Sequence, residues 1–377
     1  MHEKLLRAIA LRVAYHMGQK LVELHGQPAR TLGMMVTAFI LAGGPWLSQM
    51  GRHLAKHSGS LRDKVNRMSR FLCHSEFDVT EAFHLVARRI VETMAHAHPK
   101  AKILIAMDWT DLGDFMGLWL SLSYQGRGLP LSCMVLQKSL AEGSMTLVEV
   151  ELIRRFLSLF SEEVRGRIVI LADRGFAKSE LFDEIQATGA HWGIRLPRDR
   201  QIRVGGAWIE LRALGVEPRE TRFLRGVEAP KEDPRKLNVA IRRLAPGEAQ
   251  DPDDDTWYVA TDMEDVADVL GWYARRFWIE EMFRDLKDRL NMDRHKLQTE
   301  ESVNKMMLVV ALAYLVILED GTQWQDRVPL DRIMKDSEWG KLSVWRRAEI
   351  YFQVGLPEVP AEMEEAIVAR WTNRRAA

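Results

Sequence analysis

Cysteine, a secretory signal and an uninterrupted membrane span are scarce or missing in this sequence of 377 residues. The two cysteines, Cys73 and Cys133, are too few for a disulfide framework or a zinc cluster, which fits a reducing compartment. The first residues, MHEKLLRAIALRV, are amphipathic and charged, unlike a secretory signal. These features exclude the small disulfide-rich secreted proteins and predict a cytoplasmic protein.

Two apolar runs approach the length of a membrane span. Residues 31–50 carry no charge, but Gly43, Gly44 and Pro45 interrupt them after roughly a dozen apolar positions. The run at 306–318 is shorter still. We therefore interpret both runs as buried core helices and expect no membrane partner.

Net charge is also absent, because 53 Lys and Arg balance 53 Asp and Glu. The charges are nevertheless segregated along the chain. Residues 1–102 hold 15 basic against 7 acidic residues, and residues 191–247 hold 13 against 7. Residues 251–270 hold eight acids and no base. Such separation suits a protein that binds a polyanion with some of its surfaces, although solvated charged faces are the commoner cause.

The pattern of apolar residues changes near residue 100. Before this point, apolar residues recur every three or four positions, which is typical of amphipathic helices, and Ser60 is placed to cap one of them. We therefore predict an all-helical, basic domain over residues 1–98 that binds DNA.

Residues 99–197 follow the pattern of a mixed α/β domain. KILIAMDW (102–109), GRIVILADRGF (166–176) and HWGIRLPR (191–198) are short apolar runs typical of buried strands. FMGLWLSLSY and LPLSCMVLQ predict a hairpin that turns at residues 125–128. With the helices expected between them, the predicted order is strand, strand, strand, helix, strand, helix, strand.

The rest of the chain divides into three predicted parts. Residues 198–262 alternate apolar and polar positions between turn residues, which predicts a β-rich insertion. Helices are predicted over residues 263–320, where the core ends. A short helical tail over residues 321–377 is a candidate dimer contact.

Two of the predicted buried strands end in aspartate, Asp108 in KILIAMD and Asp173 in IVILAD. Ligands gather at the carboxyl ends of strands in α/β sheets, and adjacent strands would bring the two carboxylates together. Mg²⁺ and Mn²⁺ accept carboxylate oxygens, and two such ions about 3.5–4 Å apart can assist a displacement at phosphorus. The alternative is a purely structural role, in which each aspartate caps a strand or a turn.

Residues 273–287, YARRFWIEEMFRDLK, contain a candidate third carboxylate. On a single α-helix, four of their polar side chains fall within a sector of roughly 60°: Tyr273, Arg276, Glu280 and Lys287. Glu280 is expected to complete the metal site. Arg276 and Lys287 would direct positive charge toward phosphates, and Tyr273 would donate a hydrogen bond to one. A solvated face with pairs of opposite charge explains the acid but not the phenol.

In this combination the residues resemble the catalytic core of bacterial DDE transposases. In particular, the chain is identified as a member of the fourth insertion-sequence family, whose signature is Y-x2-R-x3-E-x6-K. The four signature positions match without an insertion, and the two strand-end aspartates precede them in the right order. The resemblance spans roughly residues 100–320.

The resemblance implies an α/β fold with an RNase H-like mixed-sheet core and a β-rich insertion between Asp173 and Glu280, which are 107 residues apart. It implies Mg²⁺, replaceable by Mn²⁺, with two ions in each active site when DNA is bound. The partners would be double-stranded DNA, as terminal inverted repeats and as target DNA, and a second copy in a synaptic dimer. The reaction would be cut-and-paste transposition near the bacterial nucleoid, with 3′-end nicking, a hairpin intermediate and strand transfer.

Four further residues are candidates for DNA binding. By the resemblance, Trp257 in WYVATDM matches a tryptophan that stacks on a flipped base, and Arg195 in HWGIRL matches an arginine that contacts the DNA backbone. Trp257 is also interpretable as a core aromatic residue of a strand. Arg284 lies on the same helix face as the signature residues, and Arg174 directly follows the second aspartate.

Two other functions are open at this point. One is an RNase H-like nuclease that cuts DNA without joining it, against which the β-rich insertion and Trp257 argue. The other is a domesticated DNA-binding protein that has lost its chemistry. The intact Asp108, Asp173 and Glu280 argue against that relic, because loss of function would be expected to remove at least one of them.

Overall fold

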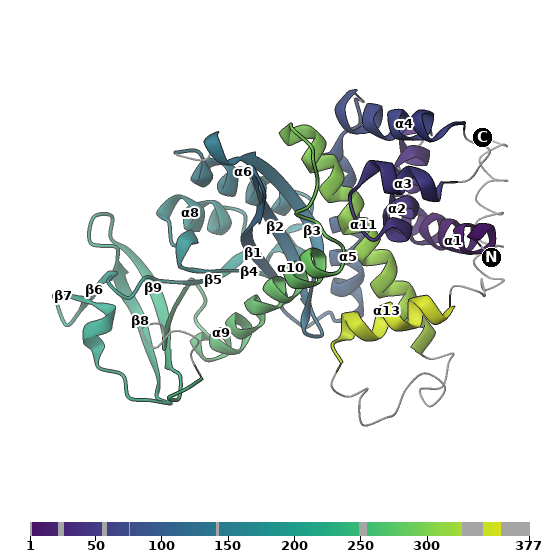
Figure 1. The fold of residues 1–377 in the computed structure, drawn as a ribbon. Helices are drawn as coiled ribbons and strands as arrows, with labels where there is room; N and C mark the ends of the chain where they lie inside the picture. The colour runs from purple at the N-terminus through teal and green to yellow at the C-terminus, as the bar shows by residue number, and fades with distance from the viewer. Residues whose placement is uncertain are drawn as a thin grey trace.

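The computed structural model describes residues 2–21, 26–54, 59–74, 76–140, 143–248, 255–325 and 342–355. The chain starts in a helical end, passes through an α/β centre to a β-rich end, and then returns to the helical end (Figure 1).

The N-terminal part is helical, as its periodicity predicts. Its helices are α1 (His2–Lys20), α2 (Gly26–Ala42), α3 (Leu47–His53), α4 (Leu61–His74) and α5 (Val79–Ala97). Helix α2 ends where Gly43 adopts a φ of +65°, and α3 then bends away by 97°. The Ser60 hydroxyl accepts a hydrogen bond from the Asp63 amide at 3.2 Å, so the predicted N-cap of α4 is confirmed.

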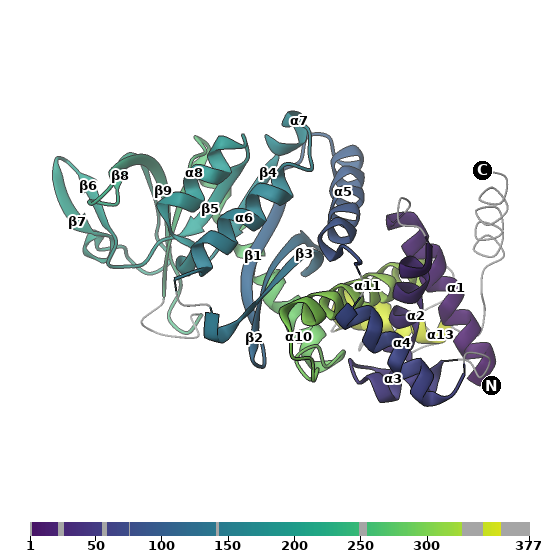
Figure 2. The ribbon, with the colours of Figure 1, turned by 90° about the horizontal axis from the view of Figure 1, so that it is seen from above.

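Helix α11 (Glu300–Gln325) lies at the centre of the helical end, and α13 (Val344–Gly355) packs against it. Seen from above, α1, α2 and α4 lie beside α11 (Figure 2). Among the described helices, α11 alone is by itself long and apolar enough to cross a membrane, but 89% of the qualifying stretch is buried inside the fold. Its prediction as a buried core helix is confirmed. The predicted tail lies largely outside the described residues.

Buried charges also join α1 to α11. The Arg12 Nε donates a hydrogen bond to an Asp320 Oδ at 2.9 Å, and a His16 ring nitrogen lies 3.3 Å from the other Asp320 oxygen. All three side chains are fully buried. Removing either partner of a buried pair leaves a desolvated charge, so this contact ties the N-terminal helices to the end of the core.

The centre of the molecule is one mixed sheet in the order β3-β2-β1-β4-β5-β10-β9-β8-β6-β7. Strands β1, β4 and β5 run parallel, whereas β2 and β3 form the predicted hairpin, which turns at Gln125 and Gly126. The strands are β1 (Ile103–Leu112), β2 (Phe115–Tyr124), β3 (Arg127–Gln137), β4 (Ile168–Ala172), β5 (His191–Arg195), β6 (Gln201–Val204), β7 (Ala207–Glu210), β8 (Thr221–Ala229), β9 (Arg235–Arg243) and β10 (Thr256–Thr261).

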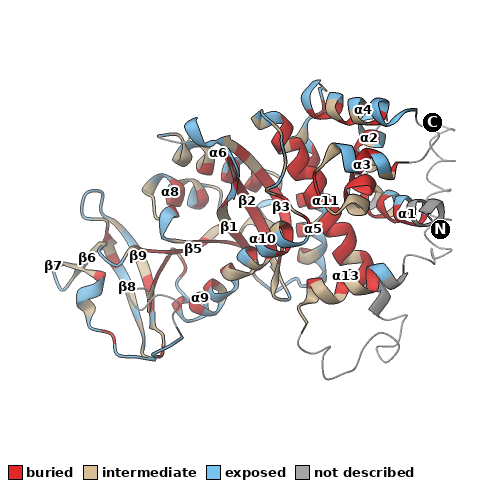
Figure 3. Cartoon of the chain, in the orientation of Figure 1, coloured by how far each residue is buried: buried red, intermediate tan, exposed pale blue. Residues whose placement is uncertain are grey.

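Helices cover both faces of the parallel strands. Helices α6 (Met145–Leu157) and α8 (Ser179–Ala187) share a buried cluster with one face of the strands, as does α5. Alternate strand residues, including Leu104 and Leu171, pack on the other face against Trp272. The central strands are therefore buried along almost their whole length (Figure 3). The predicted order of elements across the centre is confirmed, with the short α7 (Glu162–Arg165) added before β4.

The β-rich segment continues the central sheet. Strand β10 pairs with β5 on one side and with β9 on the other, both antiparallel, so the sheet extends from the centre into the β-rich end without a break. The short 3-10 helix η4 (Leu211–Leu214) follows the β6–β7 hairpin. The prediction of strands over residues 198–262 is thus confirmed for the described part of the segment.

The prediction that the first strand ends at Asp108 is wrong. Parallel pairing with β4 stops at Met107, but antiparallel pairing with β2 continues from Asp108 to Leu112. Because one neighbour ends and the other does not, β1 extends four residues past the aspartate. Asp111, three residues after Asp108, therefore also lies in the strand.

The prediction of one continuous helix over residues 273–287 is also wrong. Helix α9 (Val266–Tyr273) is separated from α10 (Trp278–Asp288) by a 3-10 turn, η6 (Ala274–Phe277). The tighter turn rotates successive side chains by a larger angle than an α-helix does. Tyr273 consequently points into a buried apolar cluster, whereas Glu280 projects from the exposed side of α10.

Candidate active site

Three polar residues follow the last paired row of the parallel strands. Met107, Ala172 and Ile194 are register partners across β1, β4 and β5. The next residue along each strand is polar: Asp108, Asp173 and Arg195. The carboxyl ends of three parallel strands therefore bring two acids and one base to the same edge, as the sequence predicts for the two aspartates.

The third acid reaches this edge from α10. Gly128 of β3 allows the helix to pack closely, because a Cβ at this position would lie 2.8 Å from the Ser121 hydroxyl and 3.3 Å from the Ile279 Cα. Glu280, directly after Ile279, projects from the exposed side of the helix, and 45% of its side chain is accessible. Packing of α10 on β3 thus carries Glu280 to the end of β1.

Arg276 joins the acid of β1 to the acid of α10. Its two terminal nitrogens donate to Asp108 at 3.3 Å and to Glu280 at 2.6 Å. The guanidinium also lies 4.4 Å from the centre of the Phe277 ring, and only 6% of the side chain is exposed. Glu280 therefore pairs with the residue four positions before it, and not with Arg284 as an ordinary solvent face would allow.

The electrostatics place Asp108 at the centre of the acids. Burial raises the pKa of Asp108 to about 7, against the opposing effect of the Arg276 guanidinium. The charges of Asp173 and Glu280 raise it further. The three carboxylates that the sequence singles out therefore interact with one another, although they come from three separate segments.

Each aspartate also bonds to nearby backbone. One Asp173 oxygen accepts from the Gly175 amide at 2.9 Å and caps the 3-10 turn η3 (Arg174–Phe176). One Asp108 oxygen accepts from the Trp109 amide at 2.9 Å. These bonds are what the capping alternative predicts, but each uses only one carboxylate oxygen and fixes the orientation of the other.

The three acids form a donor set of the kind that Mg²⁺ and Mn²⁺ prefer, because all of their ligand atoms are carboxylate oxygens. Within the described ranges, no group of three or more acidic, histidine or cysteine side chains is already close enough to hold a metal ion. The positive charge of Arg276 instead lies between Asp108 and Glu280 and balances them. The three acids fit a divalent cation by their chemistry, and the guanidinium supplies the positive charge between two of them.

Tyr273 and Trp257 lie in an aromatic cluster beside the acids. The Tyr273 side chain is fully buried, and its hydroxyl has no hydrogen-bond partner in the described part of the chain. The half-buried Trp257 ring is stacked on Phe277 at 5.7 Å and meets Tyr273 edge-on at 5.4 Å. The partial burial agrees with the interpretation of Trp257 as a core aromatic residue, while one part of the ring stays accessible.

The two remaining basic residues of α10 differ in their surroundings. The Lys287 side chain is half-buried and has no hydrogen bond or ion pair within the described residues. The pKa of Asp111 is lowered chiefly by its hydrogen bond from Lys138, and to a smaller extent by the charge of Lys287. Arg284 is 64% exposed and pairs with Glu281 at 2.9 Å. Lys287 is therefore the one of the two whose charge stays available along this side of the site.

A buried glutamate, which the sequence pattern was not used to predict, links the segments that follow Asp108 and Asp173. Glu149 of α6 is 1% exposed. One of its oxygens accepts from the Trp109 indole at 3.0 Å, and the other accepts from the Lys178 ammonium at 2.7 Å. Trp109 follows Asp108, and Lys178 lies five residues after Asp173. A signal was present, because Glu149 falls on the apolar face of a periodic helix with buried residues three, four and seven positions later.

The comparisons with known proteins agree with this arrangement. Residues 124–316, slightly more than half of the chain, match the family model of the transposase DDE domain. The matched region contains Asp173, Glu280 and the whole of α10, and it begins after Asp108. No curated protein sequence matches the chain.

Proposed function

The chain belongs to the transposase DDE domain family of metal-dependent enzymes that cut and transpose DNA, and from this premise we propose that Asp108, Asp173 and Glu280 are its catalytic carboxylates. The observation that carries the proposal is the meeting of Asp108 and Glu280 at the Arg276 guanidinium, with the charge of Asp173 close enough to raise the pKa of Asp108. These acids come from three segments that lie far apart in the sequence.

We further propose that the enzyme belongs to the fourth insertion-sequence family and has an RNase H-like core. The strand order β3-β2-β1-β4-β5, with an antiparallel hairpin beside three parallel strands, supports this core. The signature Y-x2-R-x3-E-x6-K supports the family assignment. On this proposal, residues 99–197 and 263–320 form the core, and residues 198–262 form the insertion.

A divalent cation is the cofactor of the family, and we propose that Asp108, Asp173 and Glu280 would hold two Mg²⁺ ions, which would supply positive charge to the oxygens at phosphorus. The protein's own part is to present ionised carboxylates. Asp108 would have to lose its proton, and Arg276 would have to release at least one of its two carboxylate partners, for the acids to hold a cation. The released guanidinium would then be able to bind a phosphate of the DNA with two parallel hydrogen bonds.

DNA is the substrate of the family, and we propose terminal inverted repeats and target DNA as the two forms it takes here. The basic helical domain over residues 1–98 would bind the repeats, and residues 321–377 would contact the second copy in a synaptic dimer. Lys287, Arg284, Arg195 and Arg174 would contact the backbone near the cut. Tyr273 would donate a hydrogen bond to a phosphate from within the aromatic cluster. Trp257 would stack on a flipped base and so hold the distorted DNA end during hairpin formation and strand transfer.

The test uses a linear duplex that carries the inverted repeats flanking this gene. The protein is incubated with the duplex and Mg²⁺ or Mn²⁺, beside the variant Glu280→Ala and the control Glu281→Ala on the same helix. Products are resolved on a denaturing gel. We expect metal-dependent nicks at the repeat boundary with the wild type and the control, and none with Glu280→Ala.

The other outcomes identify the competing functions. Retardation of the duplex without cleavage would indicate a DNA-binding relic and contradict the catalytic assignment. Nicks without any joined product, when target DNA is supplied, would indicate a nuclease that does not transfer strands. Cleavage by Glu280→Ala at the wild-type rate would remove Glu280 from the site.

A further inference from the structure

A second polar centre lies next to the carboxylates, at the junction of the central sheet and the β-rich end. It is a pocket of about 230 Å³, which we name the arginine pocket. Its lining includes one acid, Asp255, and five bases: Arg174, Arg195, Arg198, Arg212 and Arg243. The volume far exceeds the space that a single water molecule requires.

Two of the arginines are held in place by the fold. The buried Arg195 donates to the Thr256 carbonyl at 2.9 Å. Arg243 donates to Asp255 at 2.7 Å and to the Val216 carbonyl at 3.0 Å. These two guanidiniums therefore have fixed positions, which lowers the entropy lost when a ligand binds.

The basic residues of the lining favour a bound anion, and their guanidinium groups favour one with several oxygen atoms. Like charges brought to one hollow repel each other, and a bound anion relieves that repulsion. Planar guanidiniums bind phosphate with paired hydrogen bonds, a match that a single compact anion such as chloride cannot reproduce. A phosphodiester is the anion of this kind that the substrate of the family supplies.

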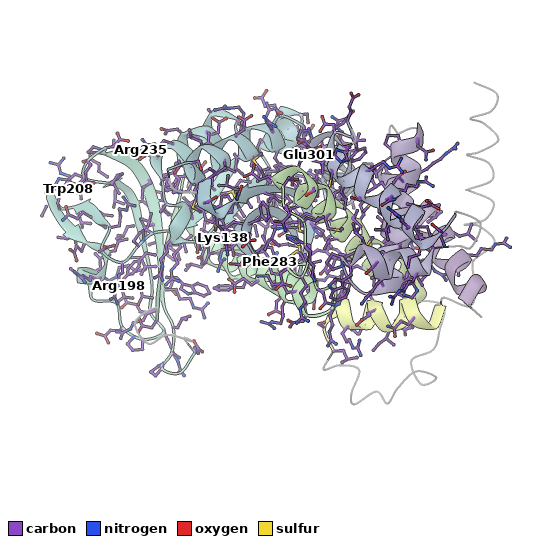
Figure 4. The ribbon with its side chains drawn as sticks, turned by 45° about the horizontal axis from the view of Figure 1, so that its top comes forward. Lys138, Arg198, Trp208, Arg235, Phe283 and Glu301 are labelled. Carbon is purple, nitrogen blue, oxygen red and sulfur yellow. The ribbon has the colours of Figure 1, made fainter. Side chains whose placement is uncertain are left out.

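Two arginines of the pocket adjoin the carboxylate site along the chain and across the sheet. Arg174 directly follows Asp173, and Arg195 stands in the same row as Asp108 and Asp173 across the parallel strands. Arg198, labelled in Figure 4, belongs to the β-rich part of the molecule and is well separated from the helical end. A strand whose scissile phosphate lies at the carboxylates would thus meet the pocket within its next few nucleotides.

We propose that the arginine pocket holds backbone phosphates of the DNA strand that enters the carboxylate site, which rests on the function proposed above. The pocket sets how far the strand extends past the scissile phosphate, and Arg198, Arg212 and Arg243 become DNA-binding residues in addition to Arg174 and Arg195. It contacts one strand, because a hollow of this volume holds a phosphate group but not the width of a duplex.

The first experiment measures how DNA affinity depends on salt. Fluorescence anisotropy with the full chain and a labelled repeat duplex compares wild type, Arg212→Ala and Arg203→Ala. The two arginines are matched, since Arg212 is 57% exposed and paired with Glu210, whereas Arg203 is 47% exposed and paired with Glu228 outside the pocket. We expect Arg212→Ala to weaken binding about tenfold and to reduce the slope of log K against log salt by about 0.9 for each phosphate that the variant no longer neutralises. Arg203→Ala should change neither.

The second experiment locates the phosphate. Single methylphosphonates, which remove one backbone charge, are placed in turn on each strand near the cleavage position. We expect one or two positions on a single strand to weaken the wild type and to have no further effect on Arg212→Ala or Arg198→Ala. Sensitive positions spread over both strands would overturn the single-strand assignment.

The outcomes separate this proposal from the proposed function. Equal effects of Arg212→Ala and Arg203→Ala would overturn the pocket, even if the wild type cleaves normally. Competition by inorganic phosphate or a nucleoside monophosphate, with unchanged DNA affinity in the variants, would assign the pocket to a free anion and also overturn it. Absence of metal-dependent cleavage by the wild type, with pocket variants still impaired in binding, would overturn the enzyme and leave the pocket.

Discussion

The carboxylate site and the arginine pocket are neighbouring polar centres with opposite charge. In the first, Asp108 and Glu280 pair with one arginine, Arg276, and the charge of Asp173 acts on Asp108. In the second, five arginines gather around one acid, Asp255, which is bonded to Arg243. In both centres, like charges are concentrated, and one residue of opposite charge helps to fix the geometry.

The two centres differ in whether their present contacts must break before a ligand can bind. Arg276 is almost fully buried and contacts two carboxylates that a cation needs, so the acid centre has to be rearranged before it can work. In the arginine pocket, Arg195 and Arg243 are held by carbonyl and carboxylate partners. On the two proposals, the acid centre would rearrange when a cation binds, whereas the arginine pocket would take up phosphate without rearranging.

The largest expected effect breaks the acid centre alone. Asp173→Ala should lower the rate of cleavage by roughly a thousandfold or more, because a ligand that positions the charge at phosphorus is lost. Affinity for the repeat duplex should change less than about twofold, since the arginine pocket is intact. Gel cleavage and anisotropy measure the two quantities. The control is Asp268→Ala in α9, an exposed acid outside the site, and equal loss of binding and cleavage would contradict the separation.

The next effect concerns the charge that holds the acids. Arg276→Ala should lower the free energy of unfolding by about 2–3 kcal/mol, less than for a fully buried pair because Glu280 is 45% exposed. A cation can replace the lost charge, so Mn²⁺ should stabilise the variant more than it stabilises the wild type. Chemical denaturation with and without Mn²⁺ measures both.

Arg275→Ala is the control for that experiment, because Arg275 is the exposed neighbour whose guanidinium lies over the Trp278 ring. It should cost less than about 1 kcal/mol and show the wild-type response to Mn²⁺. The same Mn²⁺ response in Arg276→Ala and in the wild type would show that the guanidinium does not occupy the place of a cation.

A smaller effect follows from pH. The pKa of Asp108 is raised to about 7 in the folded protein, so the metal-free protein loses stability from this group as pH rises from about 4 to about 7. Cation binding requires the ionised form, so Mn²⁺ affinity should rise about tenfold per pH unit below pH 7 and level off above it. Titration calorimetry at several pH values tests this, and Asp108→Asn should abolish the dependence. Affinity that is constant between about pH 6 and pH 8 would contradict it.

The smallest effect concerns the link between the two strand ends. Glu149→Ala should weaken Mn²⁺ affinity about tenfold and leave DNA affinity unchanged, because Trp109 and Lys178 lose their common acceptor. Glu149→Gln keeps an oxygen for the Trp109 indole and should recover part of the loss. Glu151→Ala removes a half-buried acid of the same helix, paired with Arg155, and should behave as the wild type. A loss of stability with normal Mn²⁺ affinity would make Glu149 a purely structural residue.

Much of the architecture was accessible from the sequence. The order of elements in the centre follows from short β-branched runs and amphipathic periods, and the Ser60 cap and the break at Gly43 follow from local backbone preferences. The two candidate aspartates were accessible because residues at the carboxyl ends of adjacent parallel strands lie close together, and Glu280 was accessible from the pattern of polar residues at 273–287. The errors at Asp108 and at Tyr273 arose where one strand neighbour continued past another and where side-chain burial favoured a tighter turn.

The sequence by itself therefore determined the elements, the acids and the family, because these depend on neighbours within a few positions along the chain. Only the tertiary structure decided which charges meet. Arg276 lies 168 residues after Asp108 and bridges it to Glu280. Glu149 joins Trp109 to Lys178, and the arginines of the pocket come from separate turns and strands. Such contacts depend on how strands are ordered and how helices pack on them, and no local pattern records that order.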